Sequence, residues 1–300
     1  LYYPPIIQDR QAPIYRAQSL LAVGAVDEAR SELERVRLTS PRNADALSLL
    51  SIMALVQGDK DQAMQFASSA VDAQPNSASA LIARSYAEQA RLDLASARAS
   101  VLRAVDVEPT NALAWARLAE LHSSFGETAQ SAAAAQRAVD LQPELSRTQT
   151  VLGFAHLSAI NVQQARDSFE KAIVLDQADP LPRLGLGLAM IRSGDLDAGS
   201  REIEVAASLD PGNALVRSYL GKVYYEEKRS PRDEREFGVA KQLDPNDPTP
   251  WFYDAIAKQT TNRPMEALRD LAKARELNDG RAIYRSQLLL DSDAAARAAS

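Results

Sequence analysis

Small and large apolar residues recur along this chain at a fixed spacing of 34 residues. If the first repeat begins at Arg10, repeat position 8 always holds a small residue, and position 27 holds Val36 followed by seven alanines. Position 24 carries large apolar residues such as Leu33, Phe169 and Phe237. Small columns beside large columns are typical of two helices that pack about 8–10 Å apart. The pattern therefore predicts pairs of closely packed helices.

Proline and glycine mark the ends of these predicted helices. Every gap between the prolines at 41, 75, 109, 143, 211 and 245 is 34 residues or twice 34. Position 15 holds glycine or asparagine in five repeats, and these residues favour the left-handed backbone that ends a helix. Each repeat is therefore predicted to be a helix–turn–helix. The predicted organisation is a lead-in at 1–9, eight repeats at 10–43, 44–77, 78–111, 112–145, 146–179, 180–213, 214–247 and 248–281, and a capping helix and tail at 282–300.

Composition narrows the class of protein. The 300 residues are 46% apolar and 25% charged, which argues against disorder. A chain of this length does not require separate domains, because a repeat array grows by adding repeats and needs no single central core. The net charge of -6 argues against a nucleic-acid partner, which needs clustered Lys and Arg. No apolar run approaches the roughly 18 residues of a membrane span, so we expect no direct membrane insertion of this segment.

These columns closely resemble the tetratricopeptide repeat family, whose signature is Trp-x2-Leu-Gly-x2-Tyr followed by Ala, an aromatic or aliphatic residue, Ala and Pro. The residues that carry the resemblance include Trp115, Leu118, Ala119 and His122, then Leu220, Gly221 and Tyr224, then Phe237, Ala240 and Pro245. The resemblance covers about residues 10–281. It implies an all-α superhelical solenoid of about eight repeats that acts as a non-catalytic protein-interaction scaffold.

Two repeats depart from the signature. In the third repeat, Arg84 and Glu88 occupy first-helix positions that are normally apolar. In the seventh, the charged segment 228–236 replaces the turn and puts Asp233 in a small, buried column. A buried carboxylate is costly unless it is paired. The segment predicts a shifted helix, with Ser230 as N-cap and Pro231 as the first helical residue.

The expected binding surface is the inner face of the superhelix, which in this family is lined by first-helix positions 2, 5, 9, 12 and 13. In this chain these positions are unusually apolar, which favours a groove for an apolar peptide or helix. The alternative is that some of these side chains seal the core between helices. The predicted groove residues are Ile52, Leu55, Ile82, Tyr86, Phe154, Leu157, Leu184, Leu188, Ile191, Tyr225, Phe252 and Ile256.

Catalytic and metal chemistry is not expected. His122 and His156, the only two histidines, share repeat position 11, and no cysteine exists to complete a zinc site. They are interpreted as substitutes for the packed Tyr of the family. No serine or cysteine nucleophile motif occurs. We therefore expect no enzyme activity, no cofactor and no metal.

The terminal segments are similar to those of bacterial envelope proteins that combine a FecR-like domain, a repeat array and an outer-membrane barrel. Leu1–Pro5 and Tyr284–Arg297 carry this resemblance. It implies a piece of a larger protein in the periplasm or cell envelope, with the cytoplasm as the alternative. The alternative functions are a structural spacer or self-association module, or the substrate-presenting arm of an enzyme whose catalytic domain lies outside this chain. The partner, expected to be a protein or peptide, and the oligomeric state are left open.

Overall fold

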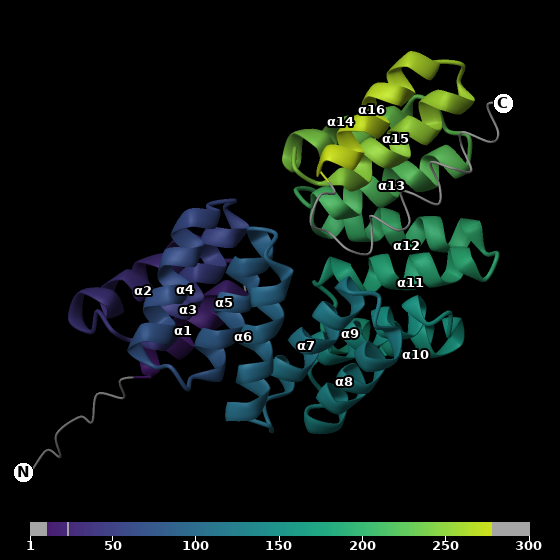
Figure 1. Ribbon diagram of the computed structural model, residues 1–300. Helices are drawn as coiled ribbons and strands as arrows, with labels where there is room; N and C mark the ends of the chain where they lie inside the picture. The colour runs from purple at the N-terminus through teal and green to yellow at the C-terminus, as the bar shows by residue number, and fades with distance from the viewer. Residues whose placement is uncertain (1–10, 23, 278–300) are drawn as a thin grey trace, which may run out of the picture. The chain divides into compact units, whose positions relative to one another are not determined.

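The structure, a computed structural model, describes residues 11–22 and 24–277, and in these residues it contains sixteen α-helices and no strand (Figure 1). The first helices of the pairs are α1 (Ala12–Ala22), α3 (Ala44–Val56), α5 (Ala78–Ala90), α7 (Ala112–Ser124), α9 (Ser146–Ser158), α11 (Pro180–Arg192), α13 (Ala214–Glu226) and α15 (Pro248–Thr260). The second helices are α2 (Val26–Thr39), α4 (Lys60–Ala73), α6 (Leu94–Val107), α8 (Thr128–Leu141), α10 (Val162–Leu175), α12 (Leu196–Leu209), α14 (Arg232–Leu243) and α16 (Pro264–Leu277).

Each predicted 34-residue repeat encloses one of these helix pairs, so the all-α repeat fold expected from the sequence is confirmed. The predicted lead-in at 1–9 and the predicted capping helix and tail at 282–300 lie outside the described residues.

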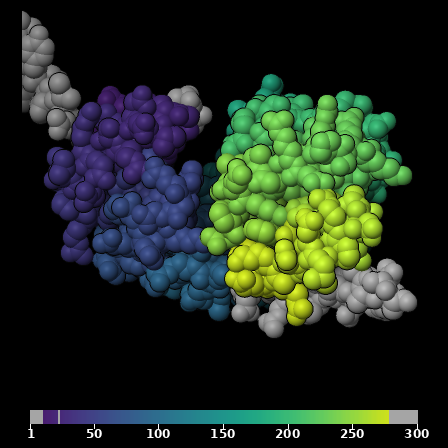
Figure 2. Space-filling view, turned by 90° about the horizontal axis from the view of Figure 1, so that it is seen from above, coloured from purple at the N-terminus to yellow at the C-terminus, as the bar shows by residue number. Residues whose placement is uncertain are grey.

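The chain divides into two compact units, Leu1–Ala114 and Trp115–Ser300, and the division falls inside α7. In the N-terminal unit, α3 packs against both α4 and α5; in the C-terminal unit, α11 packs against α9, α10 and α12. Figures 1 and 2 show that, inside each unit, helices close in sequence are close in space. This nearest-neighbour packing is the arrangement by which repeat proteins are stabilised.

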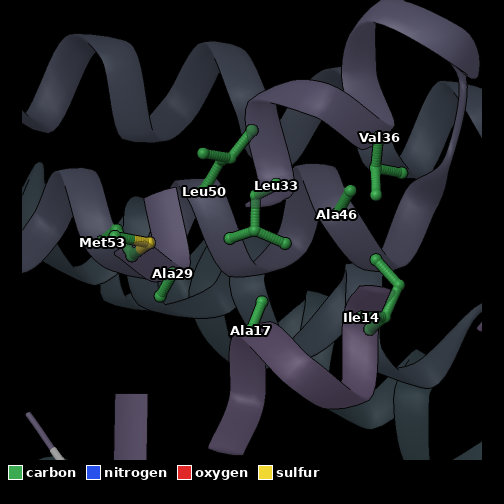
Figure 3. Packing of buried hydrophobic residues seen from close by; sticks show 8 residues of the cluster. All are labelled: Ile14, Ala17, Ala29, Leu33, Val36, Ala46, Leu50 and Met53. Atoms are coloured by element: carbon green, nitrogen blue, oxygen red, sulfur yellow. The ribbon is translucent and has the colours of Figure 1, made fainter. Parts of the chain in front are cut away.

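Repeat position 24 forms the centre of the core. The side chains at this position are 0% exposed in the first seven repeats. In the first repeat, Leu33 of α2 lies among side chains of its own first helix and of the next one (Figure 3). The neighbours shown are Ile14 and Ala17 of α1, Ala29 and Val36 of α2, and Ala46, Leu50 and Met53 of α3. Burying a Leu or Phe side chain stabilises a fold by about 1.5–3 kcal/mol.

The small columns allow the two helices of a repeat to touch through their backbones. A Cβ added to Gly187 of α11 would lie 2.7 Å from the carbonyl oxygen of Gly199 of α12, and one added to Gly199 would lie 2.5 Å from the carbonyl oxygen of Gly187. Phe169 similarly fills the space over Gly153 and Gly185. The predicted close packing of small columns against large side chains is therefore observed.

The turn inside each repeat uses left-handed backbone at position 15. The glycines and Asn262 at this position have φ between 58° and 92°, as the sequence predicts. The three remaining repeats place Leu92, Ile160 and Lys228 there, with φ of 65°, 64° and 57°. A side chain with Cβ is disfavoured in this region by about 1–2 kcal/mol. The repeat geometry thus imposes the left-handed turn even where the residue opposes it.

In the seventh repeat, the predicted shift of the helix start is observed, but the predicted cap is not. Helix α14 begins at Arg232, after a five-residue turn instead of the three residues seen between α3 and α4. Pro231 takes the N-cap position without a side-chain hydrogen bond, and the N–H of Arg232 donates to the carbonyl oxygen of Arg229 at 2.8 Å. The predicted Ser230 cap and Pro231 helix start are therefore wrong, because this backbone turn occupies the place of a side-chain cap.

Candidate functional site

The predicted groove residues all lie on first helices, and eleven of the twelve are half-buried. Leu184 of α11 is the exception, because it is only 1% exposed and belongs to the core that α11 forms with α12 and α13. Leu184 therefore seals the interhelical core, which is the alternative that the sequence left open. The remaining residues form two sets, one in each compact unit.

In the N-terminal unit, the set consists of Ile52 and Leu55 on α3 and Ile82 and Tyr86 on α5. Leu55 packs against a buried alanine cluster that α3, α4 and α5 share. The adjacent Val56 is largely exposed at the end of α3. This set is smaller than the set in the C-terminal unit, and Leu55 takes part in core packing.

In the C-terminal unit, α9 and α11 carry an aliphatic and aromatic section of the predicted groove. Phe154 of α9 packs edge-on against the buried ring of Phe169, with ring centroids 4.9 Å apart. Leu157 lies against the same core cluster. Leu188 and Ile191 of α11 pack on the next cluster along the chain. One part of each side chain therefore supports the core and another part reaches the surface.

Helices α13 and α15 continue this surface with aromatic rings. Phe252 and Tyr253 of α15 have ring centroids 5.4 Å apart, and Tyr219 of α13 lies 6.0 Å from Tyr253. The ammonium group of Lys222 lies 5.5 Å from the centre of the Tyr253 ring, within the range of a cation–π interaction. Tyr225 and Ile256, on the same two helices, are half-buried.

A charged cluster borders this surface on α7 and α9, and the sequence analysis did not identify it. Arg117, which is buried, contacts Glu120 at 2.9 Å, and Arg147 of α9 pairs with the same carboxylate. Burial disfavours the charged carboxylate, but the two guanidinium groups hold the pKa of Glu120 below its usual value. At the start of α11, burial raises the pKa of Asp179, whose carboxylate caps that helix.

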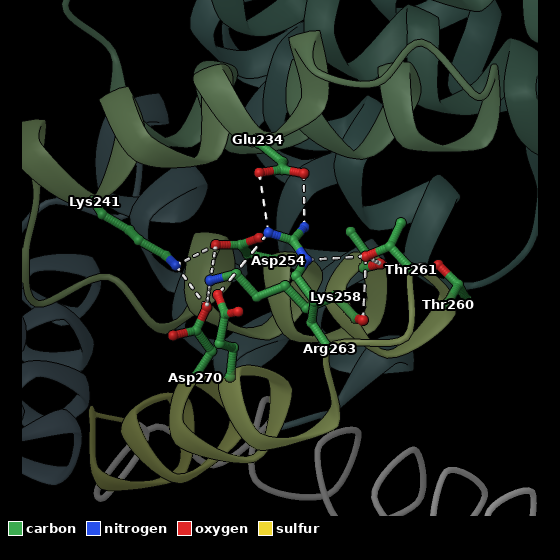
Figure 4. A network of polar contacts seen from close by, with 10 residues as sticks. Glu234, Lys241, Asp254, Lys258, Thr260, Thr261, Arg263 and Asp270 are labelled. Carbon is green, nitrogen blue, oxygen red and sulfur yellow. Dashed lines mark hydrogen bonds and ion pairs between the residues drawn. The ribbon is translucent and has the colours of Figure 1, made fainter.

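A second charged network joins the seventh and eighth repeats (Figure 4). Lys241 of α14 and Lys258 of α15 each contact both Asp254 of α15 and Asp270 of α16, at 2.5–3.0 Å. Asp254 and Lys258 occupy repeat positions 7 and 11, where the family signature has Leu and Tyr. The charged residues at these two positions, where the signature has apolar or aromatic residues, could have indicated the network from the sequence. Its members lie between helices, so we interpret it as structural.

The charged departure in the third repeat has the same structural character. Glu88, at position 11, is buried; it accepts from Arg84 at 2.9 Å and from the hydroxyl of Ser100 at 2.7 Å. Asp233 in the seventh repeat is different. It is 4% exposed, and its Oδ1 has no hydrogen-bond partner among the described residues. No hydrogen bond to Oδ1 from the described residues therefore offsets the cost of burying that oxygen.

The histidines do not come together as a metal site. Nδ1 of His122 lies 2.5 Å from a carboxylate oxygen of Glu127, and burial lowers the pKa of His156. Within residues 11–22 and 24–277, no group of three or more His, Cys, Asp or Glu side chains could hold a metal ion. The same part of the chain has no helix with the length and apolar character of a membrane span.

A separate hollow of about 500 Å³ lies along α10, away from the predicted groove residues. Its lining residues are Pro143, Gln149, Asp167, Glu170, Lys171, Val174 and Leu175. The side chain of Val174 is 78% exposed. This hollow was not predicted from the sequence; most of its lining residues come from the second helix α10, and Gln149 comes from the first helix α9.

Comparison with known proteins agrees with the repeat architecture. A tetratricopeptide repeat family model matches residues 16–78. No curated protein sequence matches the chain. Among solved structures, the chain is similar to one in the crystal structure of the APC/C hetero-tetramer Cut9–Hcn1, with 19% identity and a TM-score of 0.72. That match covers 95% of this chain and 56% of the other, so this chain spans just over half the length of that relative.

Two bacterial structures are also similar. A tetratricopeptide repeat protein from Parabacteroides merdae has 17% identity and a TM-score of 0.58, covering 82% of this chain and 97% of that one. PilF of Pseudomonas aeruginosa has 20% identity and a TM-score of 0.50, and the match covers 67% of this chain and 92% of PilF. The family model matches residues 16–78, and these structures show that the chain has the tetratricopeptide repeat fold.

Proposed function

We propose that the chain is a non-catalytic protein-interaction scaffold that binds a peptide or helix along the first helices of its C-terminal unit. The observation that supports this most strongly is the arrangement of α9, α11, α13 and α15, each of which contacts the next. Repeat position 12 carries Leu157, Ile191 and Tyr225 on α9, α11 and α13, and position 9 carries Phe154, Leu188 and Ile256 on α9, α11 and α15; all six side chains are half-buried. Apolar side chains that repeat on adjacent helices make a continuous strip for a partner.

The core contacts of these residues favour such a role. Because the inner parts of Leu157 and Leu188 pack against the clusters around Phe169 and Ile203, these two side chains are held in place before a partner arrives. A pre-ordered surface loses less conformational entropy on binding. Covering roughly 200 Å² of apolar surface would contribute about 5 kcal/mol before the costs of association.

The charged groups beside this strip support orientation of the partner. Glu120 pairs with Arg117 and Arg147 at one side, and Lys222 pairs with Glu226 at 3.2 Å on α13. Charges at the border of an apolar interface contribute to specificity and register more than to affinity. The partner is therefore expected to combine apolar anchors with polar flanks.

The test is to place charge on the proposed strip and to compare it with charge placed elsewhere. Leu188→Glu combined with Tyr225→Glu is expected to weaken partner capture at least about tenfold, or roughly 1.4 kcal/mol. Phe154 is avoided because its ring supports the buried Phe169. The matched control is Val174→Glu with Val205→Glu, two exposed valines on the second helices α10 and α12.

Capture would be measured with purified chain and a crosslinked, mass-identified partner, and helicity by circular dichroism. Equal capture by the strip variant and wild type, with both folded, would reject the strip. Loss of capture only in the control variant would move the site to the second helices. If no specific partner is captured under any condition, the spacer function is favoured instead.

We also propose that the array is part of a larger bacterial envelope protein. The similarity of its terminal segments to proteins with a FecR-like domain and an outer-membrane barrel supports this. Fractionation of cells that produce the full-length protein tests it. Recovery in the periplasm or envelope is expected, and recovery only in the cytoplasm would contradict the proposal.

A further inference from the structure

The hollow along α10 combines apolar and charged lining residues. The side chain of Val174 is 78% exposed and that of Leu175 is 40% exposed, and both line the hollow. Asp167, Glu170 and Lys171, one and two helical turns earlier on α10, also line it, so carboxylates outnumber ammonium groups two to one. We call this surface the α10 hollow. Its volume of about 500 Å³ is in the range of ligand sites in proteins.

The link between two repeats binds a guanidinium group at two other places in the chain. The carbonyl oxygen of Pro211, at repeat position 32, accepts a hydrogen bond from Nε of Arg217 at 3.0 Å. The carbonyl oxygen of Pro75, at the same repeat position, accepts one from Arg103 at 3.2 Å. Pro143 is the equivalent proline, and it lines the α10 hollow. The repeat geometry therefore places an acceptor for a guanidinium group beside this hollow.

The fifth repeat has no arginine of its own at either position that supplies one elsewhere. Position 26 holds Lys171, and position 4 holds Gln149, whose side-chain amide donates to the Pro143 carbonyl oxygen at 2.9 Å. In the sixth and seventh repeats, the arginine at position 4 pairs with a glutamate at position 23 of the second helix: Arg183 with Glu202 and Arg217 with Glu236, each at 2.9 Å. Position 23 of the fifth repeat is Ser168, so this ion pair is missing there. Because a carbonyl oxygen has two lone pairs, Pro143 can accept from a second donor.

We propose that the α10 hollow is a docking site for an arginine side chain that a protein partner presents. Its guanidinium group pairs with the carboxylates of Asp167 and Glu170, which lie three residues apart on one face of α10, and donates to the Pro143 carbonyl oxygen. Its methylene groups cover Val174. Glu170 forms no ion pair with another described residue, so its carboxylate is available. The planar, forked guanidinium group suits several acceptors better than an ammonium group does.

Lys171 sets the limit on this site, because its ammonium group repels a second cation at the same hollow. The inference does not depend on the strip proposed above, since the strip lies on first helices and most of the α10 hollow lies on a second helix.

The probe is a short amidated peptide with one arginine between two leucines, and the control peptide has citrulline in place of the arginine. Citrulline keeps the shape of the side chain and removes its charge. Each peptide is titrated into the full chain with labelled valine methyl groups, and the Val174 methyl resonance, assigned by its loss in Val174→Ala, is followed by NMR. We expect a saturable shift with the arginine peptide and an affinity for the citrulline peptide that is at least about threefold weaker.

Two exposed positions on α10 allow matched variants of opposite sign. Glu170→Gln should weaken binding of the arginine peptide about threefold, and Lys171→Gln should strengthen it by a similar factor. Gln149→Arg with Ser168→Glu gives the fifth repeat the Arg–Glu pair of the next two repeats and should abolish binding. Leu188→Glu with Tyr225→Glu, the strip variant, should bind the peptide as the wild type does, so the strip and the α10 hollow are tested separately.

Circular dichroism would check the helicity of each variant. If Gln149→Arg with Ser168→Glu reduces helicity, the two glutamine variants still decide the outcome. Absence of a saturable Val174 shift with the arginine peptide, or equal affinities for the arginine and citrulline peptides, would overturn the proposal. Stronger binding in Glu170→Gln together with weaker binding in Lys171→Gln would also overturn it, because it would identify an anionic group as the occupant.

Discussion

The close approach of α11 and α12 predicts opposite effects for one substitution made at two sites. Gly187 faces the backbone of Gly199, and an added Cβ would also lie 2.6 Å from Cγ1 of Ile203. Gly238 lies in α14, where an added Cβ would meet no atom within 4 Å. Gly187→Ala should therefore lower the free energy of unfolding, and Gly238→Ala should raise it.

The magnitudes follow from two terms. Replacing Gly by Ala inside a helix contributes about 1 kcal/mol of stability. Overpacking costs about 1–3 kcal/mol, and the upper end applies to Gly187 because one contact is a backbone oxygen that cannot rotate away. We expect a loss of about 2 kcal/mol for Gly187→Ala and a gain of about 1 kcal/mol for Gly238→Ala.

Urea unfolding followed by circular dichroism at the helix band would measure both changes. Because repeat arrays can unfold in parts, hydrogen exchange of α11 and α14 should accompany it. A Gly187→Ala chain as stable as wild type would refute the inferred backbone contact. Equal destabilisation by both substitutions would show that local packing does not decide the outcome.

Three further predictions concern turns and buried charges. Ile160→Gly should leave the free energy of unfolding unchanged or raise it, because Ile160 is 64% exposed and has a φ of 64°. Gly126→Ile at the equivalent turn should lower the free energy of unfolding by about 1–2 kcal/mol. Urea unfolding of both variants would measure these changes. Asp233→Ala should raise the urea midpoint, because it removes a buried carboxylate with an unbonded oxygen; a lower midpoint would contradict this. Burial opposes the charged form of Asp270, but hydrogen bonds from Lys241 and Lys258 hold the pKa of this carboxyl below its ordinary value. The ionised Asp270 therefore stabilises the fold above the ordinary Asp pKa, and this contribution is lost as pH falls through the lowered pKa. The protection of α16 amides against hydrogen exchange, corrected for the intrinsic pH dependence of exchange, should fall at acid pH, and Asp270→Asn should reduce that fall.

Much of the fold was predictable because packing repeats every 34 residues. Small residues at position 8 and large ones at position 24 require close helix pairs, and the structure contains them. The glycines at position 15 predicted the turns, but Leu92 and Ile160 at that position gave no such signal. Their left-handed backbone is imposed by the neighbouring helices, which a local propensity cannot show.

The candidate site was less predictable, because first-helix positions have two roles. Leu184 and Leu188 are both apolar and lie one helical turn apart, yet Leu184 is fully buried and Leu188 is half-buried. The difference in burial depends on the angle at which adjacent helix pairs pack, and the sequence periodicity alone does not determine that angle. Likewise, Asp254 and Lys258 depart from the signature in a visible way, but their partners Lys241 and Asp270 come from other helices.

The most direct test of the proposed scaffold is a photo-crosslink from the strip itself. Benzoylphenylalanine would replace Tyr225 on α13 in one chain and Val205 on the second helix α12 in another, and each would be irradiated with the captured partner. The account predicts crosslinks to the partner from position 225 and few or none from position 205. Crosslinks from position 205 alone would contradict it.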